Sequence, residues 1–413
     1  MNKNRKPRFF YGYIIVLAAF IVQIVGWMMY SAYGVFFGPM ITEFGWMRAV
    51  TSGPYSLYLV IQGLLSIVMG RINDRFGPRV VTIACGSSLG LGYLLLSQIS
   101  DIWQLYLFFG VLVGIGMACI WVPLLSTVSR WFVRRRALMC GIISAGFVAS
   151  IAVMPLVAGW LVSIYGWRES YIIFAVITLV IVIGASLLMK RDPCQMGLSP
   201  YGRNEPTGAN LNLQLSGLSL QQAIYTRQLW LLSGVYVLFL LSFAAYAVHI
   251  VIHATGLGIS LASAANILVI SGAVSFPGGI ILAGASDKIG GRLVLSISCM
   301  LLVIASLCLQ FADGLWMFYL FAIIFTLGYA SGVALMSTIV AELFGTSSHG
   351  VILGVVNFSA TIGCTVGPVL TGYIFDVTGS YQVAFLVCAA VSLIGLIITL
   401  FIKPIHRKKE AGS

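Results

Sequence analysis

The sequence predicts an all-α membrane protein with twelve transmembrane helices in two pseudo-symmetric six-helix bundles. Three observations support this fold class. Of the 413 residues, 60% are hydrophobic and only 8% are charged, whereas soluble domains carry about 25% charged residues. The apolar residues form twelve runs, each near the length of about 20 residues that crosses a bilayer. The two halves of the chain also repeat. The first observation alone excludes a soluble enzyme.

The twelve apolar runs are separated by glycine, proline or charged residues. Because the hydrocarbon holds no water to bind backbone amides, each run must form a helix or a barrel strand, and these long runs lack period-two alternation. They therefore predict helices. In chain order, the predicted spans are residues 10–37, 50–70, 80–100, 102–129, 137–163, 168–190, 229–254, 261–285, 293–312, 314–341, 350–376 and 380–402.

The first span follows MNKNRKPR and is too long for a signal-peptide core, so we expect it to remain as a helix. Of the 23 Lys and Arg residues, only Arg48 and Arg168 fall on one side of the predicted spans. Because basic residues stay cytoplasmic, this asymmetry predicts an even number of spans with both termini in the cytoplasm. We expect a multi-pass protein of the inner membrane. Its net charge of +12 is explained by short loops at anionic lipid headgroups, without nucleic acid.

One long polar segment, residues 191–228, divides the spans six and six and is predicted to be a cytoplasmic linker. Within it, SLQQAIYTRQ has the Ser and Gln spacing of a helix start, which predicts a short helix on the membrane surface. The expected domains are an N-terminal six-helix bundle at 1–190, this linker, a C-terminal six-helix bundle at 229–402 and a cytoplasmic tail at 403–413.

The two bundles repeat each other weakly at an offset of 213 residues, which relates Asp74 to Asp287. Matches of glycine and proline carry most weight, because apolar residues coincide by chance in such a composition. The other matched pairs are Gly77 with Gly290, Arg79 with Arg292, Gly141 with Gly354, Pro155 with Pro368, Gly159 with Gly372, Gly166 with Gly379, Tyr33 with Tyr246 and Gly45 with Gly258. A parallel six-plus-six repeat is the layout of major facilitator transporters, which bind substrate near the midplane between the halves.

Two loops carry a resemblance to that superfamily. The loop after the second span reads GRINDRFGPR, and its copy after the eighth reads SDKIGGR; both resemble the major facilitator loop signature. We interpret the charges of these loops as a cytoplasmic latch, in which the aspartates accept hydrogen bonds from basic residues and helix ends. Ordinary interfacial charge is the alternative. The predicted gating residues are Asp74, Arg75, Arg79, Asp287, Lys288 and Arg292.

A narrower resemblance covers most of the chain. The segments YGVFFGPMITEFGW, RWFVRRRALMCGIISAG, YGWRESY and HATGLGIS are similar to bacterial relatives of the monocarboxylate transporters, including the oxalate-formate type. The resemblance implies proton-linked or exchange movement of small organic anions, with an arginine in the eighth helix that pairs with the substrate carboxylate. This chain has Gly279 where those relatives tend to carry the arginine, and Ser31 near the position of a lysine in the first helix.

Every acidic residue lies at a predicted loop or helix end, so the sequence offers no carboxylate at mid-bilayer for a proton relay. The remaining titratable candidates, His249 and His253, share one face of the seventh span. His249 can donate to an anionic or carbonyl group of a substrate, or it can be a hydrogen-bonded interfacial residue; for His253 we favour the second role. Two histidines at this spacing can bind zinc, but no third ligand is nearby, and we expect no metal.

Aromatic and polar residues on the spans complete the candidate site. The resemblance implies that the first, fourth, seventh and tenth spans line the cavity. Tyr and Trp can enclose an organic ligand and offer it one hydrogen-bonding tip; an interfacial aromatic belt and contacts between helices are the alternatives. The predicted substrate-binding residues are His249, Tyr329, Ser275, Gly279, Tyr30, Ser31, Trp121, Tyr246, Asn357 and Phe358, with Trp27, Tyr33, Asn266 and Thr361 as further candidates.

The leading hypothesis is a secondary transporter that moves a small organic acid, such as a monocarboxylate, across the inner membrane by alternating access, with protons as a candidate coupling ion. The alternative is an exporter or facilitator of a neutral or weakly polar organic compound, which the uncharged interior favours. No phosphate-binding loop is present for ATP hydrolysis. Four histidines and no buried acid are too few for a di-metal oxidase. We therefore expect no catalytic residue, no cofactor and a monomer.

Overall fold

The computed structural model describes residues 10–202, 217–312 and 314–403. Within these ranges, twelve helices are long and apolar enough to cross a membrane. Each coincides with one of the runs predicted from the sequence. The prediction of a twelve-helix, all-α membrane protein is therefore confirmed.

The N-terminal half contains the first six spans, two of which are divided into shorter helices. The first span consists of α1 (Gly12–Gly26) and α2 (Met28–Phe44), and the next two are α3 (Arg48–Phe76) and α4 (Pro78–Leu96). The fourth consists of α5 (Ile102–Leu105), the π-helix η1 (Tyr106–Val113), α6 (Gly114–Ala118) and α7 (Trp121–Trp131). The last two are α8 (Arg136–Tyr165) and α9 (Trp167–Leu188), followed by the short η2 (Pro193–Met196).

The C-terminal half begins with a five-residue helix, α10 (Leu220–Ile224). Ser219 and Gln222 form a capping box at its start, which confirms the predicted helix in this segment. The six spans that follow are α11 (Arg227–Gly256), α12 (Leu261–Ile289), α13 (Gly291–Cys308) with η4 (Leu309–Phe311), α14 (Leu315–Phe344), α15 (His349–Thr378) and α16 (Tyr381–Phe401).

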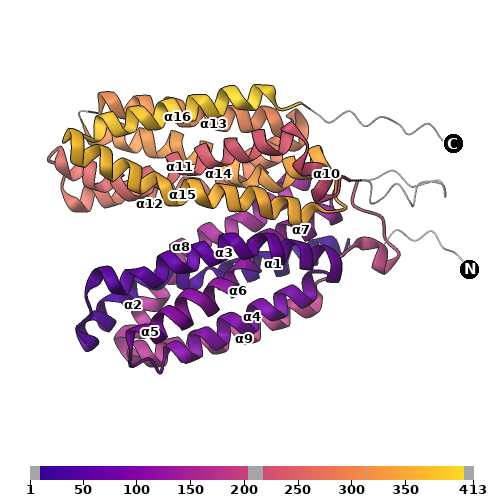
Figure 1. The fold of residues 1–413 in the computed structure, drawn as a ribbon, viewed down its shortest axis with the longest axis horizontal. Helices are drawn as coiled ribbons and strands as arrows, with labels where there is room; N and C mark the ends of the chain where they lie inside the picture. The colour runs from indigo at the N-terminus through magenta and orange to yellow at the C-terminus, as the bar shows by residue number, and fades with distance from the viewer. Residues whose placement is uncertain (1–9, 203–216, 313, 404–413) are drawn as a thin grey trace, which may run out of the picture.

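The two halves lie side by side as separate layers of helices, and the described chain begins and ends at the same end of the molecule (Figure 1). Between the halves, α3 packs against α15 and α8 packs against α12. These two contacts are equivalent under the sequence repeat, because α3 corresponds to α12 and α8 to α15. The halves therefore meet through a pseudo-two-fold arrangement of four helices.

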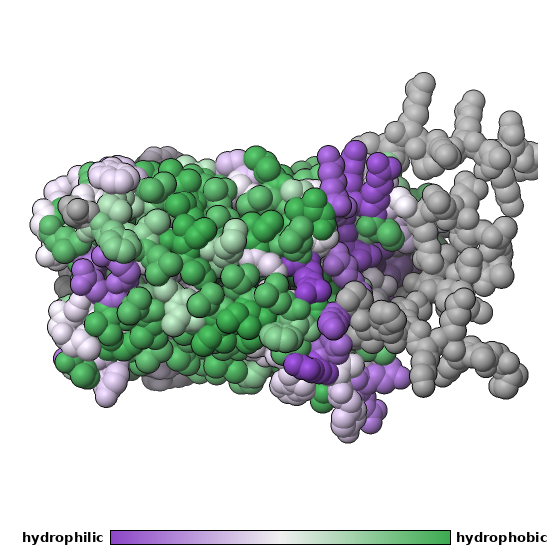
Figure 2. Space-filling view, turned by 90° about the horizontal axis from the view of Figure 1, so that it is seen from above, coloured by the Kyte–Doolittle hydropathy of each residue, from purple (hydrophilic) through white to green (hydrophobic). Residues whose placement is uncertain are grey.

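The outer surface separates into an apolar belt and a basic end (Figure 2). Large apolar side chains point outward along the spans; Leu156 is 74% exposed and Val369 is 70% exposed. In water such a surface would be unstable, whereas lipid tails solvate it. We call the end where the chain begins and ends the basic end, because its exposed cations include Arg71, Arg75, Arg79, Lys288 and Arg292.

Glycines make the tight turns that return the chain at the basic end. Gly77 ends α3 with a φ of +88°, and Gly290 ends α12 with a φ of +93°. These φ values strain residues that carry a Cβ atom, so glycine is required at both equivalent turns. Pro78 then begins α4, where its missing N–H costs nothing.

The first span is longer than the sequence predicted. We expected it to end at residue 37, but α2 continues through Gly38 and Pro39 to Phe44. The helix ends only at Gly45, whose φ is +66°. Similarly, α11 begins at Arg227 rather than at 229, because Thr226 adopts an extended conformation at its start.

Candidate functional site

A cavity lies between the two halves, near the middle of the spans. Its two main parts have volumes of about 120 and about 240 Å³. A narrow third part lies between them, and all three share Phe147 and Tyr329. Because α8 of one half and α14 of the other line every part, both halves must contact any ligand held there.

Breaks in two spans place tryptophans on the cavity. Pro123 cannot donate a backbone hydrogen bond to the carbonyl of Cys119, so the fourth span is interrupted between α6 and α7, and Trp121 begins the new helix. Trp27 lies between α1 and α2, where its Nε1 donates to Gln23 Oε1 at 2.6 Å. Both indole rings line the cavity.

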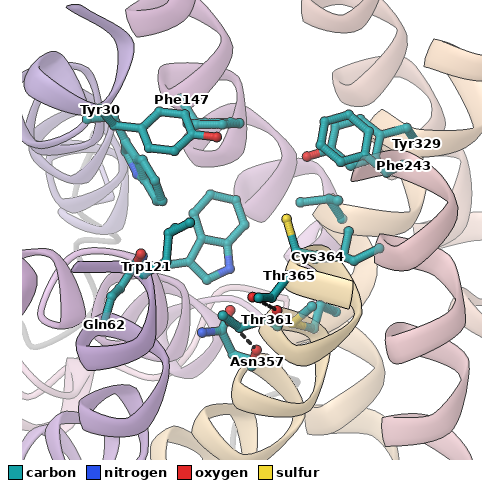
Figure 3. A pocket seen from close by; sticks show the side chains of 15 residues that line it. Tyr30, Gln62, Trp121, Phe147, Phe243, Tyr329, Asn357, Thr361, Cys364 and Thr365 are labelled. Carbon is teal, nitrogen blue, oxygen red and sulfur yellow. Dashed lines mark hydrogen bonds between the residues drawn. The ribbon is translucent and has the colours of Figure 1, made fainter. Parts of the chain in front are cut away.

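Aromatic rings from both halves line the cavity (Figure 3). On the C-terminal side, Tyr329 is stacked on Phe243 with ring centroids 3.7 Å apart. On the N-terminal side, Phe147 contacts Trp27 and Tyr30, with centroids 4.7 and 5.8 Å away. The two groups of rings face each other across the cavity, an arrangement suited to a flat or apolar ligand body.

One side of the cavity is polar. Gln62 on α3 faces Asn357, Thr361, Cys364 and Thr365, which lie along α15 (Figure 3). The hydroxyls of Thr361 and Thr365 donate to backbone carbonyls of their own helix at 3.0 Å. The side-chain amides of Gln62 and Asn357 make no hydrogen bond with the described residues, so both are available to a ligand.

The cavity is uncharged. The described residues that line its three parts include no Asp, Glu, Lys, Arg or His. Its hydrogen-bonding groups are the two amides together with hydroxyl, indole and thiol groups. The site can therefore recognise a ligand by shape, aromatic contact and neutral hydrogen bonds, but it offers no ion pair.

The structure brings together seven of the ten residues predicted to bind substrate. Tyr30, Trp121, Tyr329 and Asn357 line the first part of the cavity, Gly279 and Ser275 line the narrow part, and Tyr246 lines the larger part; the lining also includes Trp27 and Thr361. Tyr33 of the first span is the repeat equivalent of Tyr246, but it lies outside the cavity lining. Its hydroxyl donates to Thr51 O at 2.7 Å.

Three predicted residues lie outside the lining. His249 contacts Tyr381 Oη at 3.2 Å and Pro368 O at 3.0 Å, both within the C-terminal half. Ser31 donates to Trp27 O at 3.0 Å along its own helix. Phe358 lies at the contact of α15 with α3 near Gly63. The further candidate Asn266 is exposed on α12.

Several lining residues were not predicted, including Gln62, Phe147, Phe243, Cys364 and Thr365. For Gln62 the sequence contains a signal, since an amide in the apolar run YLVIQGLL must find a polar partner or a cavity. The aromatic and small residues carry no such signal, because lipid-facing positions accept them equally well.

Two aspartates close the basic end of the cavity. Asp74 on α3 accepts from the backbone N–H groups of Gly350 and Val351 on α15, both at 2.9 Å. Asp287 on α12 accepts from Ala137 and Leu138 on α8, both at 3.0 Å. The donors are second and third residues of helices that lack a cap from their own chain segment. Each half thus supplies the N-terminal cap of a helix in the other half.

The basic residues near the two aspartates differ in their contacts. Arg130 forms an ion pair with Asp74, and only 3% of the Arg130 side chain is exposed. Arg292 donates to Thr399 O and Leu400 O at the end of α16, and the Arg75 guanidinium lies over the Phe76 ring. The other predicted gating residues, Arg79 and Lys288, are exposed at the same end.

Glycines allow helices of the two halves to approach each other closely behind the caps. A Cβ atom added to Gly354 would lie 2.7 Å from Ser66 O, and one added to Gly141 would lie 2.7 Å from Ala283 Cβ. Gly141 and Gly354 are equivalent in the repeat. The basic end is thus closed at both inter-half contacts by the same device, a glycine that lets one helix approach another.

Comparisons with known proteins agree with this architecture. Residues 19–309 and 232–413 match the family model described as Major Facilitator Superfamily. Cattle monocarboxylate transporter 13 is 31% identical over 397 residues, covering 93% of this chain and 88% of the relative. Human monocarboxylate transporter 12 is 26% identical, covering 97% and 82%.

Solved structures share the fold at low identity. The human organic anion transporter MFSD10 (TETRAN) has a TM-score of 0.70 at 16% identity, and the E. coli fucose:proton symporter has a TM-score of 0.71 at 13% identity; each covers 96% of this chain and 100% of the other. The protein is thus a multi-pass membrane transporter of small molecules rather than an enzyme. The chain belongs to the major facilitator superfamily and resembles its monocarboxylate transporters.

Proposed function

We propose that the protein is a secondary transporter that moves a small organic acid across the inner membrane by alternating access. The observation that carries the proposal is the position of the cavity between two pseudo-symmetric halves. Contacts between the halves close it at the basic end, whereas its larger part extends away from that end to Ile250 and Phe321. Rocking of the halves would expose such a site to each side of the membrane in turn.

The orientation follows from the distribution of charge. Because short cytoplasmic loops retain Lys and Arg, we place the basic end and both termini in the cytoplasm. The structure then represents the conformation that is closed to the cytoplasm. Opening toward the cytoplasm requires both aspartates to release the helix ends that they cap, which makes the two caps a latch on the transport cycle.

The relatives and the lining support an organic acid as substrate. The cattle and human relatives are named as monocarboxylate transporters. In this cavity the aromatic rings would enclose the apolar body of the acid, and the amides of the polar side would bind its carboxyl group. Protons are the proposed coupling ion. A monomer suffices, because one chain supplies the whole lining.

Uptake into proteoliposomes tests the proposal. We expect radiolabelled monocarboxylates, with acetate, lactate and phenylacetate as the panel, to accumulate when the outside is acidic. Liposomes without protein control for passive entry of the acids. The variant Trp121→Ala tests whether uptake depends on the cavity lining. The absence of protein-dependent uptake for the whole panel would contradict the proposal.

A second candidate function is passage of a neutral, largely apolar compound, and the uncharged lining favours it. The same proteoliposomes separate the two functions. Accumulation driven by the pH gradient supports the organic acid, whereas a flux that ignores the gradient and accepts neutral analogues supports the neutral compound.

A further inference from the structure

We infer that the substrate occupies the cavity as an uncharged, protonated carboxylic acid whose carboxyl group is held by the amides of Gln62 and Asn357. The inference rests on the proposed function and deepens it by assigning the protonation state of the substrate and two residues that recognise it. The transported proton would then travel on the substrate itself, bound to its carboxyl oxygen, and no side chain of the protein would have to carry it.

The first argument is the missing counter-charge. Taking a carboxylate out of water without an opposite charge costs far more than burying a neutral polar group. The described lining contains no Lys, Arg or His to offset that cost. His249 does not supply it, because its ring nitrogens contact Tyr381 and Pro368 outside the lining. The neutral acid avoids most of the cost.

The second argument is the hydrogen-bonding pattern of Gln62. This residue is 8% exposed and lines the cavity without a partner among the described residues. Its amide offers one acceptor oxygen beside two donors. A protonated acid matches this pair, since its O–H donates to Oε1 while its carbonyl accepts from Nε2. A carboxylate has no hydrogen for Oε1 and would leave that acceptor without a partner from the ligand.

Asn357 offers the same chemistry on the same polar side of the cavity, from the helix packed against α3. It faces the cavity from α15, while Gln62 faces it from α3 (Figure 3). The carboxyl group therefore meets an amide from each half of the protein. Under the sequence repeat, Gln62 corresponds to Ser275 and Asn357 to Ser144, so only one side of the pseudo-symmetric cavity carries amides.

Titratable groups around the polar side do not alter this conclusion. Those that line it are Tyr30 from α2, Tyr329 from α14 and Cys364 from α15, and Tyr55 and Tyr58 of α3 pack against Tyr30. Phenols and thiols are uncharged at neutral pH. The helices α7 and α11 contribute only apolar and indole side chains to this part of the cavity.

Binding of three ligands of similar shape tests the inference. The probes are phenylacetic acid, phenylacetamide and phenylmethanesulfonate, which is ionised at every pH used, and the signal is the fluorescence of the cavity tryptophans in purified full-length protein. We expect the amide to bind independently of pH and the sulfonate not to bind. The apparent Kd of the acid should rise about tenfold per pH unit above its own pKa, because only the protonated fraction binds.

Variants then assign the recognition to Gln62. Gln62→Leu, which has a similar volume and no amide, should weaken binding of the acid and of the amide by about tenfold. The matched control Gln382→Leu changes an exposed glutamine that does not line the cavity and should leave both affinities unchanged. Correct folding is checked by gel filtration and circular dichroism.

The possible failures are distinguishable. Binding of the sulfonate, an acid affinity that does not change with pH, or full affinity in Gln62→Leu would overturn this inference and leave the transport proposal intact. Failure of all three ligands to bind would overturn the assignment of this substrate class. Absence of protein-dependent uptake in proteoliposomes would contradict the transport proposal instead.

Discussion

Removing the charge of Asp287 should open the basic end of the molecule. The carboxylate accepts from the backbone N–H groups of Ala137 and Leu138, one to each oxygen. In Asp287→Asn, one oxygen remains as an acceptor and the new NH₂ group faces a second donor. The variant therefore loses one charge-assisted hydrogen bond and the attraction between the carboxylate and the N-terminus of α8.

The size of the effect follows from the exposure of the site. A hydrogen bond to a charged group contributes about 1.5 to 3 kcal/mol, and we take the lower value because Asp287 is exposed to solvent. A change of about 1.5 kcal/mol shifts an equilibrium about tenfold. The ratio of molecules closed at the basic end to molecules open there should thus fall about tenfold in Asp287→Asn.

Distances between the halves report this ratio directly. Spin labels at Val80 and Leu293, which are exposed and equivalent in the two halves, measure the basic end, and labels at Trp103 and Trp316 measure the opposite end. In a cysteine-free background, double electron-electron resonance should show longer basic-end distances and shorter distances at the opposite end for Asp287→Asn. The control Asp376→Asn removes a charge from an exposed position of α15 that makes no hydrogen bond or ion pair with the described residues.

Two results would refute the reasoning. Unchanged distributions in Asp287→Asn would mean that the cap does not hold the basic end closed. An equal change in Asp376→Asn would mean that net charge, and not the cap, controls the distances. Asp74→Asn is the less suitable test, because it also leaves the buried Arg130 without its ion pair and so endangers folding.

Three further predictions use uptake and stability of purified variants. Gly354→Leu should abolish uptake in a folded protein, because even its Cβ would lie 2.7 Å from Ser66 O; uptake at the wild-type rate would show that the halves need not approach so closely. Tyr329→Ala should raise KM by up to about tenfold, because it removes an aromatic ring that lines both main parts of the cavity, and an unchanged KM would remove it from the site. His249→Ala should lower the melting temperature by the loss of about 1 kcal/mol of hydrogen bonding and keep KM, so a raised KM would return His249 to the binding site.

The sequence predicted part of the candidate site, because polar and aromatic residues on the spans expected to face the cavity, such as Trp121 and Tyr329, do line it. Asp74 and Asp287 were predicted as gating residues because charged residues recur at equivalent loops; both cap helices of the opposite half, and their role in gating stays a prediction. His249 was a candidate by chemistry alone, and its ring is turned toward α15 and α16. Gln62 was missed because one amide in an apolar run does not reveal which neighbour it faces.

The number of spans, their helical nature and the two-bundle repeat are properties of the sequence itself. Lipid leaves backbone groups no partner outside their own helix, so about 20 apolar residues have only one spanning conformation. The sequence by itself does not determine the direction in which each side chain points, because this direction depends on helix rotation and on local breaks such as the one at Pro123. Contacts between helices of both halves set the helix rotations and the local breaks. These contacts alone decided that Gln62, Trp121 and Tyr329 share one uncharged cavity.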